Sequence, residues 1–402
     1  MKVLQINTTI NSGSTGRIVE DIGKSILLAK NESYVAYSRK SMPSKSTKLS
    51  IGSKIDFYYH ILQTRLFDLH GFGSKISTRY FIQEIEIINP DVIHLHNIHG
   101  YYLNIEILFD YLKKKKTPLV WTFHDCWAFT GHCTYFDSVN CKKWKTGCYS
   151  CPKTQMYPKS WFIDNSENNY IVKKDLFQEF EKLTIVTPSH WLKNVVKESF
   201  LNDYEISVIH NGIDLEVFKP RNSFYSKKIN ELKSKNIVLG VASIWDDRKG
   251  LKDFIRISSK LEISFQIVLI GCSKSQIKLL PKNILGISRT ENTEELAAWY
   301  SAAKVFVNPT YQDNFPTTNI EALACGTPVV TYDTGGSGES INDATGIIVK
   351  KGDINELLTA IKKIVSYDSS AFKILCRQRA EQNYDRNDRY QDYLELYDNL
   401  II

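Results

Sequence analysis

The sequence predicts an α/β protein with two domains, each built around a parallel β-sheet covered by helices. Apolar runs of strand length recur along the chain, for example at residues 2–7, 119–123, 237–243 and 305–307. These runs lead into polar loops and then into stretches with helical periodicity, as in repeated βα units. The chain has 402 residues, and because one hydrophobic core rarely grows beyond about 250–300 residues, we expect two domains.

The composition is ordinary for a soluble globular protein, with 43% hydrophobic and 24% charged residues. The net charge of +7 is a modest excess, and it suits a negatively charged partner such as a nucleotide or an anionic membrane surface. We do not expect a nucleic acid as a partner. Met1–Asn7 turns polar before a signal peptide's apolar core would be complete, and no apolar stretch approaches the ~20 residues of a spanning helix. We therefore expect a cytoplasmic protein, with peripheral contact at the inner face of the membrane as a further hypothesis.

The first predicted strand, residues 2–7, leads into the loop Asn11–Arg17 and then a helix with apolar residues at Ile18, Ile22 and Ile26. The loop does not match the Gly-x-Gly-x-x-Gly fingerprint of dinucleotide sites, so a phosphate or a substrate is expected there and hydride transfer is disfavoured. Gly16 and Arg17 are the candidate ligand contacts. A tight turn beside a solvated arginine is the alternative.

The segment Phe57–Phe67 is rich in aromatic residues and predicts an amphipathic helix. Exposed aromatic side chains beside Arg65, His70 and Lys75 would suit an acceptor site or the edge of a membrane. Burial of most of these rings in the core is the simpler interpretation.

Histidines lie at the ends of two predicted strands. Pro90–Leu95 leads into His96 and Asn97, and alternation places His94 and His96 on the same side of the strand. Because no acidic third ligand is adjacent, we interpret these histidines as hydrogen-bonded groups and not as metal ligands. The strand from Leu119 ends in the same way, at His124 and Asp125.

The first domain is expected to end with the strand Thr184–Thr187, which turns into a helix capped by Ser189. The second domain restarts at Ile237, and its first strand is followed by Arg248 and Lys249 just before a helix. A helix N-terminus with two cations can bind a diphosphate and neutralise the charge of a departing phosphate. A solvated loop with two cations is the alternative.

Four cysteines lie within the insertion at residues 131–152: Cys133, Cys141, Cys148 and Cys151. Four thiols in one loop, two of them as Cys-x-x-Cys, favour a structural zinc ion held tetrahedrally. Disulfides are the main alternative, and a redox or iron–sulfur site is the next. Such a closed metal site has no open position, so we expect the zinc to take no part in catalysis.

The most informative stretch is Val307–Glu339. A strand ends before a polar loop with Asp313, a short helix carries Glu321, and a second strand, residues 328–332, leads to a glycine-rich turn. The candidate residues of that turn are Gly335, Gly336, Ser337 and Glu339. Glycine amides can approach phosphate oxygens and carboxylates can accept bonds from sugar hydroxyls, so the combination favours a nucleotide-sugar. An ordinary βαβ unit is the alternative.

This stretch resembles the retaining GT-B glycosyltransferases of the large group one family. The family has Glu-x7-Glu followed by Ala-x-Gly-x-Pro-Val, and here Asp313 and Glu321 keep the spacing while residues 321–330 read EALACGTPVV. The first acid is an aspartate, one methylene shorter than the family's glutamate. Lys249 also matches the family's Lys-Gly, whereas the family's preceding arginine falls at Ser243, so we assign its charge to Arg248.

The resemblance implies two Rossmann-like domains facing a cleft: an acceptor domain at residues 1–210, a donor domain at 211–380 and a returning helix at 381–402. It implies transfer of a sugar from a UDP- or GDP-sugar to a hydroxyl of a glycan or lipid-linked glycan, without a catalytic divalent metal. The segment HDCWAFTGHC resembles a subgroup associated with extracellular polysaccharide assembly, including capsule. A GT-B epimerase and a binding-only pseudoenzyme remain as alternatives.

The resemblance also assigns the site residues. The catalytic residues would be His124, Asp313, Arg248 and Lys249, with the diphosphate held also by the backbone of Gly335–Ser337. Glu321 would bind the ribose, Glu339 the sugar, and Gly16 and Arg17 would face the donor across the cleft. His96, Asn97 and Asp125 would lie on the acceptor side.

Overall fold

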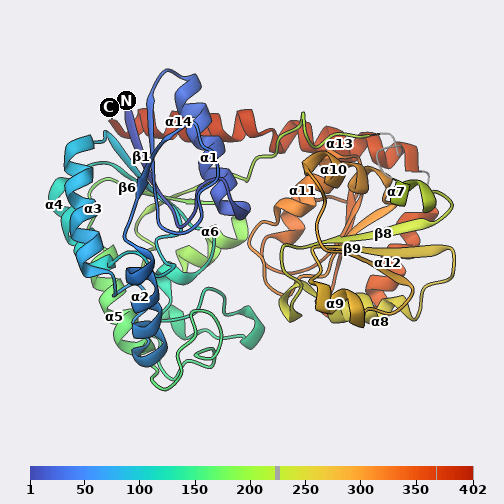
Figure 1. Ribbon diagram of the computed structural model, residues 1–402, viewed down its shortest axis with the longest axis horizontal. Coiled ribbons are helices and arrows are strands. Elements are labelled where there is room, and N and C mark those ends of the chain that lie inside the picture. Colours follow the sequence, from blue (N-terminus) through green and yellow to red (C-terminus); the bar gives the residue numbers. More distant parts are fainter. Residues whose placement is uncertain (222–226, 368, 402) are drawn as a thin grey trace. The chain divides into compact units, whose positions relative to one another are not determined.

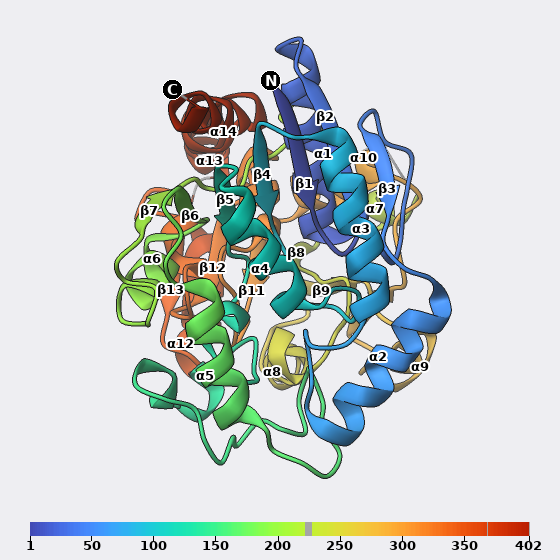
Figure 2. The ribbon, with the colours of Figure 1, turned by 90° about the vertical axis from the view of Figure 1, so that its left-hand side faces the viewer.

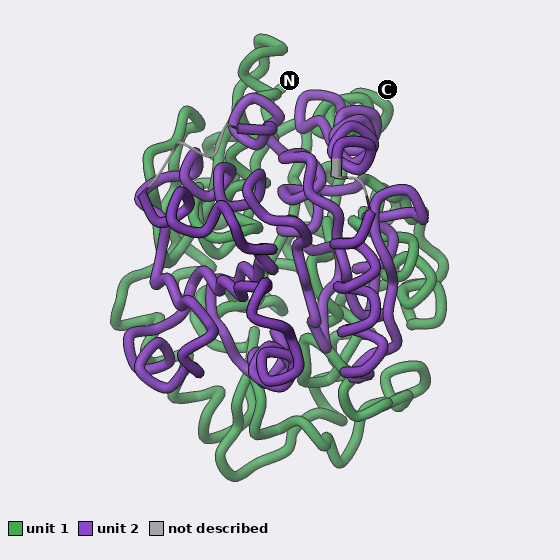
Figure 3. Tube along the Cα trace, turned by 90° about the vertical axis from the view of Figure 1, so that its right-hand side faces the viewer, with its two compact units in different colours: residues 1–209, 390–402 green, residues 210–389 purple. Residues whose placement is uncertain are grey.

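The computed structural model describes residues 1–221, 227–367 and 369–401, which form two compact units (Figures 1 and 3). Unit 1 comprises residues 1–209 and 390–402, and unit 2 comprises residues 210–389. Unit 2 thus continues past residue 380, and Ile402, the end of the predicted returning helix, lies outside the described residues.

The strands of unit 1 form one parallel sheet in the order β3-β2-β1-β4-β5-β6-β7. They are β1 Lys2–Ile6, β2 Glu32–Tyr37, β3 Thr47–Ser50, β4 Val92–Leu95, β5 Leu119–Thr122, β6 Leu183–Thr187 and β7 Glu205–Val208. The prediction that Thr184–Thr187 is the last strand of the first domain was wrong, because β7 pairs with β6 at the edge. Only Ile206 of β7 is buried, so its sequence lacks the apolar run of a central strand.

Helices cover both faces of this sheet. They are α1 Gly13–Leu28, α2 Lys54–Phe67, α3 Lys75–Ile88, α4 Ile105–Lys115, α5 Ser166–Phe177, α6 His190–Lys197 and α14 Arg386–Ile401, whose residues from Tyr390 onward belong to unit 1. Helices α3, α4 and α5 lie side by side on one face (Figure 2). Helices α1 and α14 share a separate core cluster with Val3, Val92 and Val120 of the sheet. Residue alternation along each strand thus supplies both cores.

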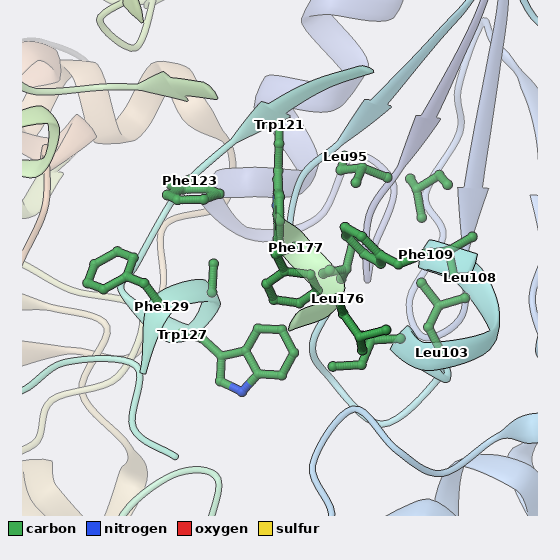
Figure 4. Packing of buried hydrophobic residues seen from close by; sticks show 14 of the residues in the cluster. Leu95, Leu103, Leu108, Phe109, Trp121, Phe123, Trp127, Phe129, Leu176 and Phe177 are labelled. Atoms are coloured by element: carbon green, nitrogen blue, oxygen red, sulfur yellow. The ribbon is translucent and has the colours of Figure 1, made fainter. Parts of the chain in front are cut away.

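The larger core of unit 1 is dominated by aromatic rings. Phe109 of α4, Trp121 of β5 and Phe177 of α5 pack together, with ring centroids 4.4 to 5.3 Å apart (Figure 4). All three are almost fully buried, and aromatic side chains of this size contribute strongly to core stability.

Unit 2 contains a second parallel sheet, in the order β10-β9-β8-β11-β12-β13. Its strands are β8 Asn236–Val241, β9 Phe265–Ile270, β10 Ile284–Ile287, β11 Val305–Asn308, β12 Val329–Tyr332 and β13 Gly346–Val349. Its helices are α7 Lys227–Glu231, α8 Leu251–Ser258, α9 Lys274–Leu279, α10 Thr293–Ala302, α11 Thr317–Ala324, α12 Ile354–Ser366 and α13 Ser369–Tyr384. The 3₁₀ turns η5 Asp247–Lys249 and η6 Ser337–Ser340 complete it. The predicted two-sheet α/β fold is therefore confirmed.

The helix cap predicted at Ser189 is confirmed, and two other helix ends show similar local chemistry. Ser189 caps α6 by accepting the amide of Leu192 at 3.1 Å, and Asn292 caps α10 through the amide of Glu295 at 2.8 Å. Gly326 follows α11 with φ +77°, the left-handed conformation expected after a helix C-terminus. Over the described residues, no helix combines the length and apolar character needed to cross a bilayer.

Candidate functional site

Each sheet reverses its strand order at one point. In unit 2 this point lies between β8 and β11, and in unit 1 between β1 and β4. Ligands of open α/β sheets bind beyond the carboxyl ends of the strands at such switch points. Most of the predicted site residues follow these strands or their neighbours.

In unit 2, η5 and the loop after β11 are joined directly. The amide of Tyr311 donates to the carbonyl of Arg248 at 2.8 Å, and Arg248 Nη1 donates to the carbonyl of Gln312 at 3.1 Å. Gly250 has φ +75°, and a Cβ there would lie 2.3 Å from the carbonyl oxygen of Pro309. Only glycine allows this close approach.

Three predicted residues meet at this junction. Arg248 connects the two segments, and Lys249 Nζ of the first lies 2.5 Å from Asp313 Oδ2 of the second. The side chains of Lys249 and Asp313 are 18% and 15% exposed. A pair that is largely removed from water interacts more strongly than a surface pair. The shorter aspartate therefore reaches the cation, which the family resemblance did not predict.

The predicted residue Glu321 lies on helix α11 of unit 2. It is 3% exposed, and its Oε2 accepts a hydrogen bond from the hydroxyl of Tyr300 at 2.9 Å. Asn319, on the same helix, donates to the carbonyl of Ser337 at 3.1 Å and so connects α11 to η6. Tyr300 and Asn319 were missed by the sequence reasoning. An asparagine within a short helix is the one signal that could have indicated Asn319, since asparagine is a poor helix former.

The predicted phosphate-binding backbone forms the turn into η6. Gly335 has φ +55°, and the amide of Ser337 donates to the carbonyl of Thr334 at 3.0 Å. That amide is therefore already part of the turn. The carbonyl of Glu339 accepts a bond from Arg379 Nη2 at 3.0 Å, which fixes the far end of the turn.

In unit 1, His96 and His124 are hydrogen-bonded to each other. His96 Nδ1 lies 3.2 Å from His124 Nε2, and His96 Nε2 lies 3.2 Å from Gln5 Oε1. Because Gln5 Nε2 donates to the carbonyl of Val19 at 3.1 Å, its oxygen must face His96. His96 therefore carries its proton on Nε2, and His124 donates its Nε2–H to His96.

Burial keeps these imidazoles neutral. It lowers the pKa of His124 to about 4 and the pKa of His96 well below its ordinary value. The ring of His94 contacts that of His96 at a tilt of 36°, with ring centroids 3.9 Å apart, which confirms that the two point to the same side. His94 also lies 2.6 Å from the hydroxyl of Tyr397, so helix α14 is part of this network.

Asp125 forms a pair with a residue that the sequence reasoning did not select. Its Oδ2 lies 2.9 Å from His99 Nε2. Burial acts to raise the pKa of Asp125, but the charge and hydrogen bond of His99 hold it below its ordinary value. Asp125 therefore stays ionised and orients the imidazole.

The loop after β1 connects the remaining candidates. Asn7 Oδ1 accepts the amide of Asn97 at 3.3 Å, and the amide of Asn11 donates to the carbonyl of Gly16 at 2.8 Å. A Cβ on Gly16 would lie 2.7 Å from Thr9 Oγ1, so glycine permits close contact of α1 with this loop. The exposed Arg17 donates to the carbonyl of Gly13 in its own helix at 3.3 Å.

The four predicted zinc ligands line one cavity of about 20 Å³. Cys133 and Cys151 are hydrogen-bonded, and Cys148 Sγ accepts the amide of Gly131 at 3.2 Å. Phe136 stacks on Trp144, with ring centroids 4.7 Å apart, so the insertion has an apolar core of its own. The eight cysteines are free thiols, and within the described part of the chain no three His, Cys, Asp or Glu side chains are arranged to hold a metal ion. Zinc therefore stays a prediction.

The two parallel sheets, each with one reversal of strand order, define the GT-B fold. The solved structure of Anabaena Alr3699/HepE in complex with UDP-glucose matches with a TM-score of 0.69 and 15% identity, covering 99% of this chain and 100% of that one.

Two family models identify the family more closely. Residues 47–217 match Glycosyltransferase Family 4, and residues 235–367 match Glycosyl transferases group 1. The chain belongs to the group 1 glycosyltransferases.

Curated relatives resemble it at lower identity. One relative is WcaC of Escherichia coli (strain K12), which is named as a colanic acid biosynthesis glycosyl transferase. The two sequences are 22% identical over an alignment of 422 residues, which covers 100% of each chain. The chain is also 28% identical over 216 residues, 50% of this chain and 56% of the other, to an N,N'-diacetylbacillosaminyl-diphospho-undecaprenol alpha-1,3-N-acetylgalactosaminyltransferase of Campylobacter jejuni.

Proposed function

We propose that the protein is a retaining glycosyltransferase of surface polysaccharide biosynthesis that moves a sugar from a UDP- or GDP-sugar to a hydroxyl of a lipid-linked glycan. The observation that carries this proposal is the junction of Arg248, Lys249 and Asp313 at the switch point of unit 2. Two cations and a carboxylate at two neighbouring strand ends suit a ligand with a diphosphate and a sugar. The HepE structure was solved with UDP-glucose, which supports a nucleotide-sugar donor.

In this mechanism, Lys249 and Arg248 bind the diphosphate of the donor. Asp313, on the neighbouring loop, accepts a bond from a hydroxyl of the donor sugar, and Glu321 accepts bonds from the ribose. The anomeric carbon loses its bond to the diphosphate oxygen, which keeps the electron pair. The two cations stabilise that developing negative charge and so lower the barrier.

The acceptor hydroxyl attacks from the side on which the diphosphate leaves, so the configuration is retained. Its oxygen forms the new bond to the anomeric carbon, and its proton passes to the departing phosphate oxygen. His124 contributes a neutral imidazole, because burial lowers its pKa to about 4. We assign its Nδ1 the role of accepting a hydrogen bond from a sugar hydroxyl.

A lipid-linked acceptor is supported by the named substrates of the Campylobacter relative and by an exposed surface of unit 1. Helix α2 exposes Tyr58 and Tyr59, and the segment 156–163 exposes Trp161 and Phe162. Helix α2 and the segment 156–163 contact each other, since the amide of Trp161 donates to the carbonyl of Arg65 at 2.7 Å. Aromatic rings beside lysine and arginine suit an anionic membrane surface.

Peripheral binding to such a membrane can be measured by flotation with vesicles containing anionic lipid. We expect Tyr58→Glu combined with Phe162→Glu to abolish flotation, while Tyr80→Glu, at an exposed tyrosine of α3, retains it. Flotation of the double variant at the wild-type level would refute membrane contact at this surface.

The donor can be identified with a panel of nucleotide-sugars. Binding of one donor should raise the melting temperature by mass action, and its hydrolysis should release the nucleoside diphosphate. Glu321→Ala should abolish both effects, whereas Glu231→Ala, at an exposed glutamate of α7, should keep them. Unchanged donor affinity in Glu321→Ala would remove Glu321 from the site. Conversion of the donor to an epimer without acceptor would instead indicate an epimerase.

A further inference from the structure

A carboxylate, an imidazole and a phenol form a continuous chain in unit 1. Asp125 Oδ2 lies 2.9 Å from His99 Nε2, and His99 Nδ1 lies 3.2 Å from the hydroxyl of Tyr157. Because the ionised Asp125 can only accept, His99 must donate its Nε2–H to it. The other ring nitrogen of His99, Nδ1, faces the hydroxyl of Tyr157.

The surroundings of this chain contain buried polar groups without a partner. His70 is 2% exposed, and among the described residues neither of its ring nitrogens has a hydrogen-bond partner. The hydroxyl of Tyr101 and the indole N–H of Trp127 are also buried and without a partner. Burying such groups without a partner is unfavourable, and such a concentration indicates a polar ligand that the protein is built to receive.

These groups lie against Tyr157. The ring of His70 is 4.7 Å from that of Tyr101, 5.5 Å from that of Trp127 and 5.5 Å from that of Tyr157. Tyr157 is 42% exposed, whereas the other rings are almost fully buried. Tyr157 is therefore the member of the cluster that solvent reaches most readily.

We propose that this cluster is the subsite for the acceptor sugar, and that His99 Nδ1 accepts the hydrogen bond of the acceptor hydroxyl at the place now held by the Tyr157 hydroxyl. Aromatic rings suit the apolar face of a pyranose, and the unpartnered N–H and O–H groups suit its other hydroxyls. His99 is thus a substrate-binding residue and Asp125 its positioning residue. The ligand class is a hexose unit of a glycan.

This inference rests on the proposed function, since it concerns the acceptor of the same reaction. His99 orients the attacking hydroxyl, and the proton still passes to the departing phosphate. A misoriented acceptor slows transfer without affecting the donor. Donor binding therefore tests the proposed function, and use of the acceptor tests the subsite. The failure of one can be distinguished from the failure of the other.

The first test needs no donor. Nitrogen-15 NMR of the histidine-labelled protein should show His99 with its proton on Nε2, and Asp125→Asn should move the proton to Nδ1, because the amide nitrogen can donate to Nε2. Titration with a panel of p-nitrophenyl hexosides should shift the His99 signals for at least one hexoside. A wild-type His99 protonated on Nδ1, or no response to any hexoside at saturating concentration, would overturn the proposal.

The second test uses the donor found by the panel and the responsive hexoside as acceptor. Asp125→Asn should lower kcat/KM for the hexoside by about 100-fold, with the donor-induced rise in melting temperature unchanged. Tyr157→Phe should lower KM for the hexoside, because the competing hydroxyl is gone, whereas the exposed control Tyr149→Phe should have no effect. A rise in KM in Tyr157→Phe, or equal loss of donor binding in Asp125→Asn, would indicate a structural role and overturn the proposal.

Discussion

Gly250 offers the sharpest test of the junction in unit 2. Replacing it by alanine adds a conformational cost and a steric cost to the free energy of folding, and a control variant can separate the two. Gly250 has a left-handed φ of +75°, which costs a residue with a Cβ roughly 1–2 kcal/mol. The added carbon would also lie 2.3 Å from the Pro309 carbonyl oxygen. The backbone must shift to relieve that overlap, at about 1–3 kcal/mol. We therefore expect Gly250→Ala to destabilise unit 2 by about 2–5 kcal/mol.

Gly352→Ala is the matched control. Gly352 has φ +79°, but the nearest atom to its added Cβ, the hydroxyl oxygen of Tyr311, is 3.4 Å away. It should show only the conformational cost, roughly 1–2 kcal/mol. Urea unfolding with a donor-binding readout measures both variants. Gly250→Ala should also turn over donor at least tenfold more slowly, because it displaces Lys249 from Asp313. Equal destabilisation and equal activity of the two variants would refute the close approach.

Three further predictions concern unit 1. Burial lowers the pKa of Lys173 from 10.5 to about 7, so between pH 7 and pH 10.5 the unfolded chain binds one more proton than the folded chain. The free energy of unfolding should therefore rise with pH in this range, by up to about 1.4 kcal/mol per pH unit. Urea unfolding should show that Lys173→Met removes this rise. Elemental analysis should find one zinc per chain, lost in Cys148→Ser; a metal-free protein with two disulfides would contradict this. Tyr397→Phe should cost about 1 kcal/mol, measured by thermal unfolding, by removing the bond to His94.

The sequence predicted what local patterns determine. Apolar runs followed by polar loops located the strand ends, and parallel sheets gather those ends on one edge. The family resemblance then assigned Arg248, Lys249 and Asp313 to one site, although their loops are far apart in sequence. The weakly apolar β7 had no such signal, since an edge strand needs only one buried face.

The partners of the candidate residues could not be predicted in the same way. Tyr300 and Glu321 lie on different helices, and nothing in the spacing of either helix indicates the other. His99 stands in a polar loop after β4, and only the folded chain places it against Asp125. Such pairs depend on side-chain packing between distant segments, which has no periodicity in the sequence.

Gln5 shows how far such a partner can act. Its amide oxygen holds His96 in the Nε2–H form, and His96 in turn accepts the Nε2–H of His124. Gln5→Met should release that constraint, so that His96 can place its proton on Nδ1 and compete with His124 as donor.

The resulting defect should appear at His124, although two hydrogen bonds and the ring of His96 separate Gln5 from it. We expect nitrogen-15 NMR to show a changed proton position on His96 and His124, and we expect sugar release from the donor to slow about tenfold or more with an unchanged donor-induced rise in melting temperature. Gln178→Met is the matched control, since Gln178 also donates its amide to a backbone carbonyl, that of Phe200 at 3.0 Å. Because Gln178 has no histidine partner in this network, its loss should leave both readouts unchanged. Slowing of the same size in the two variants would show that lost packing, and not the fixed tautomer, is responsible.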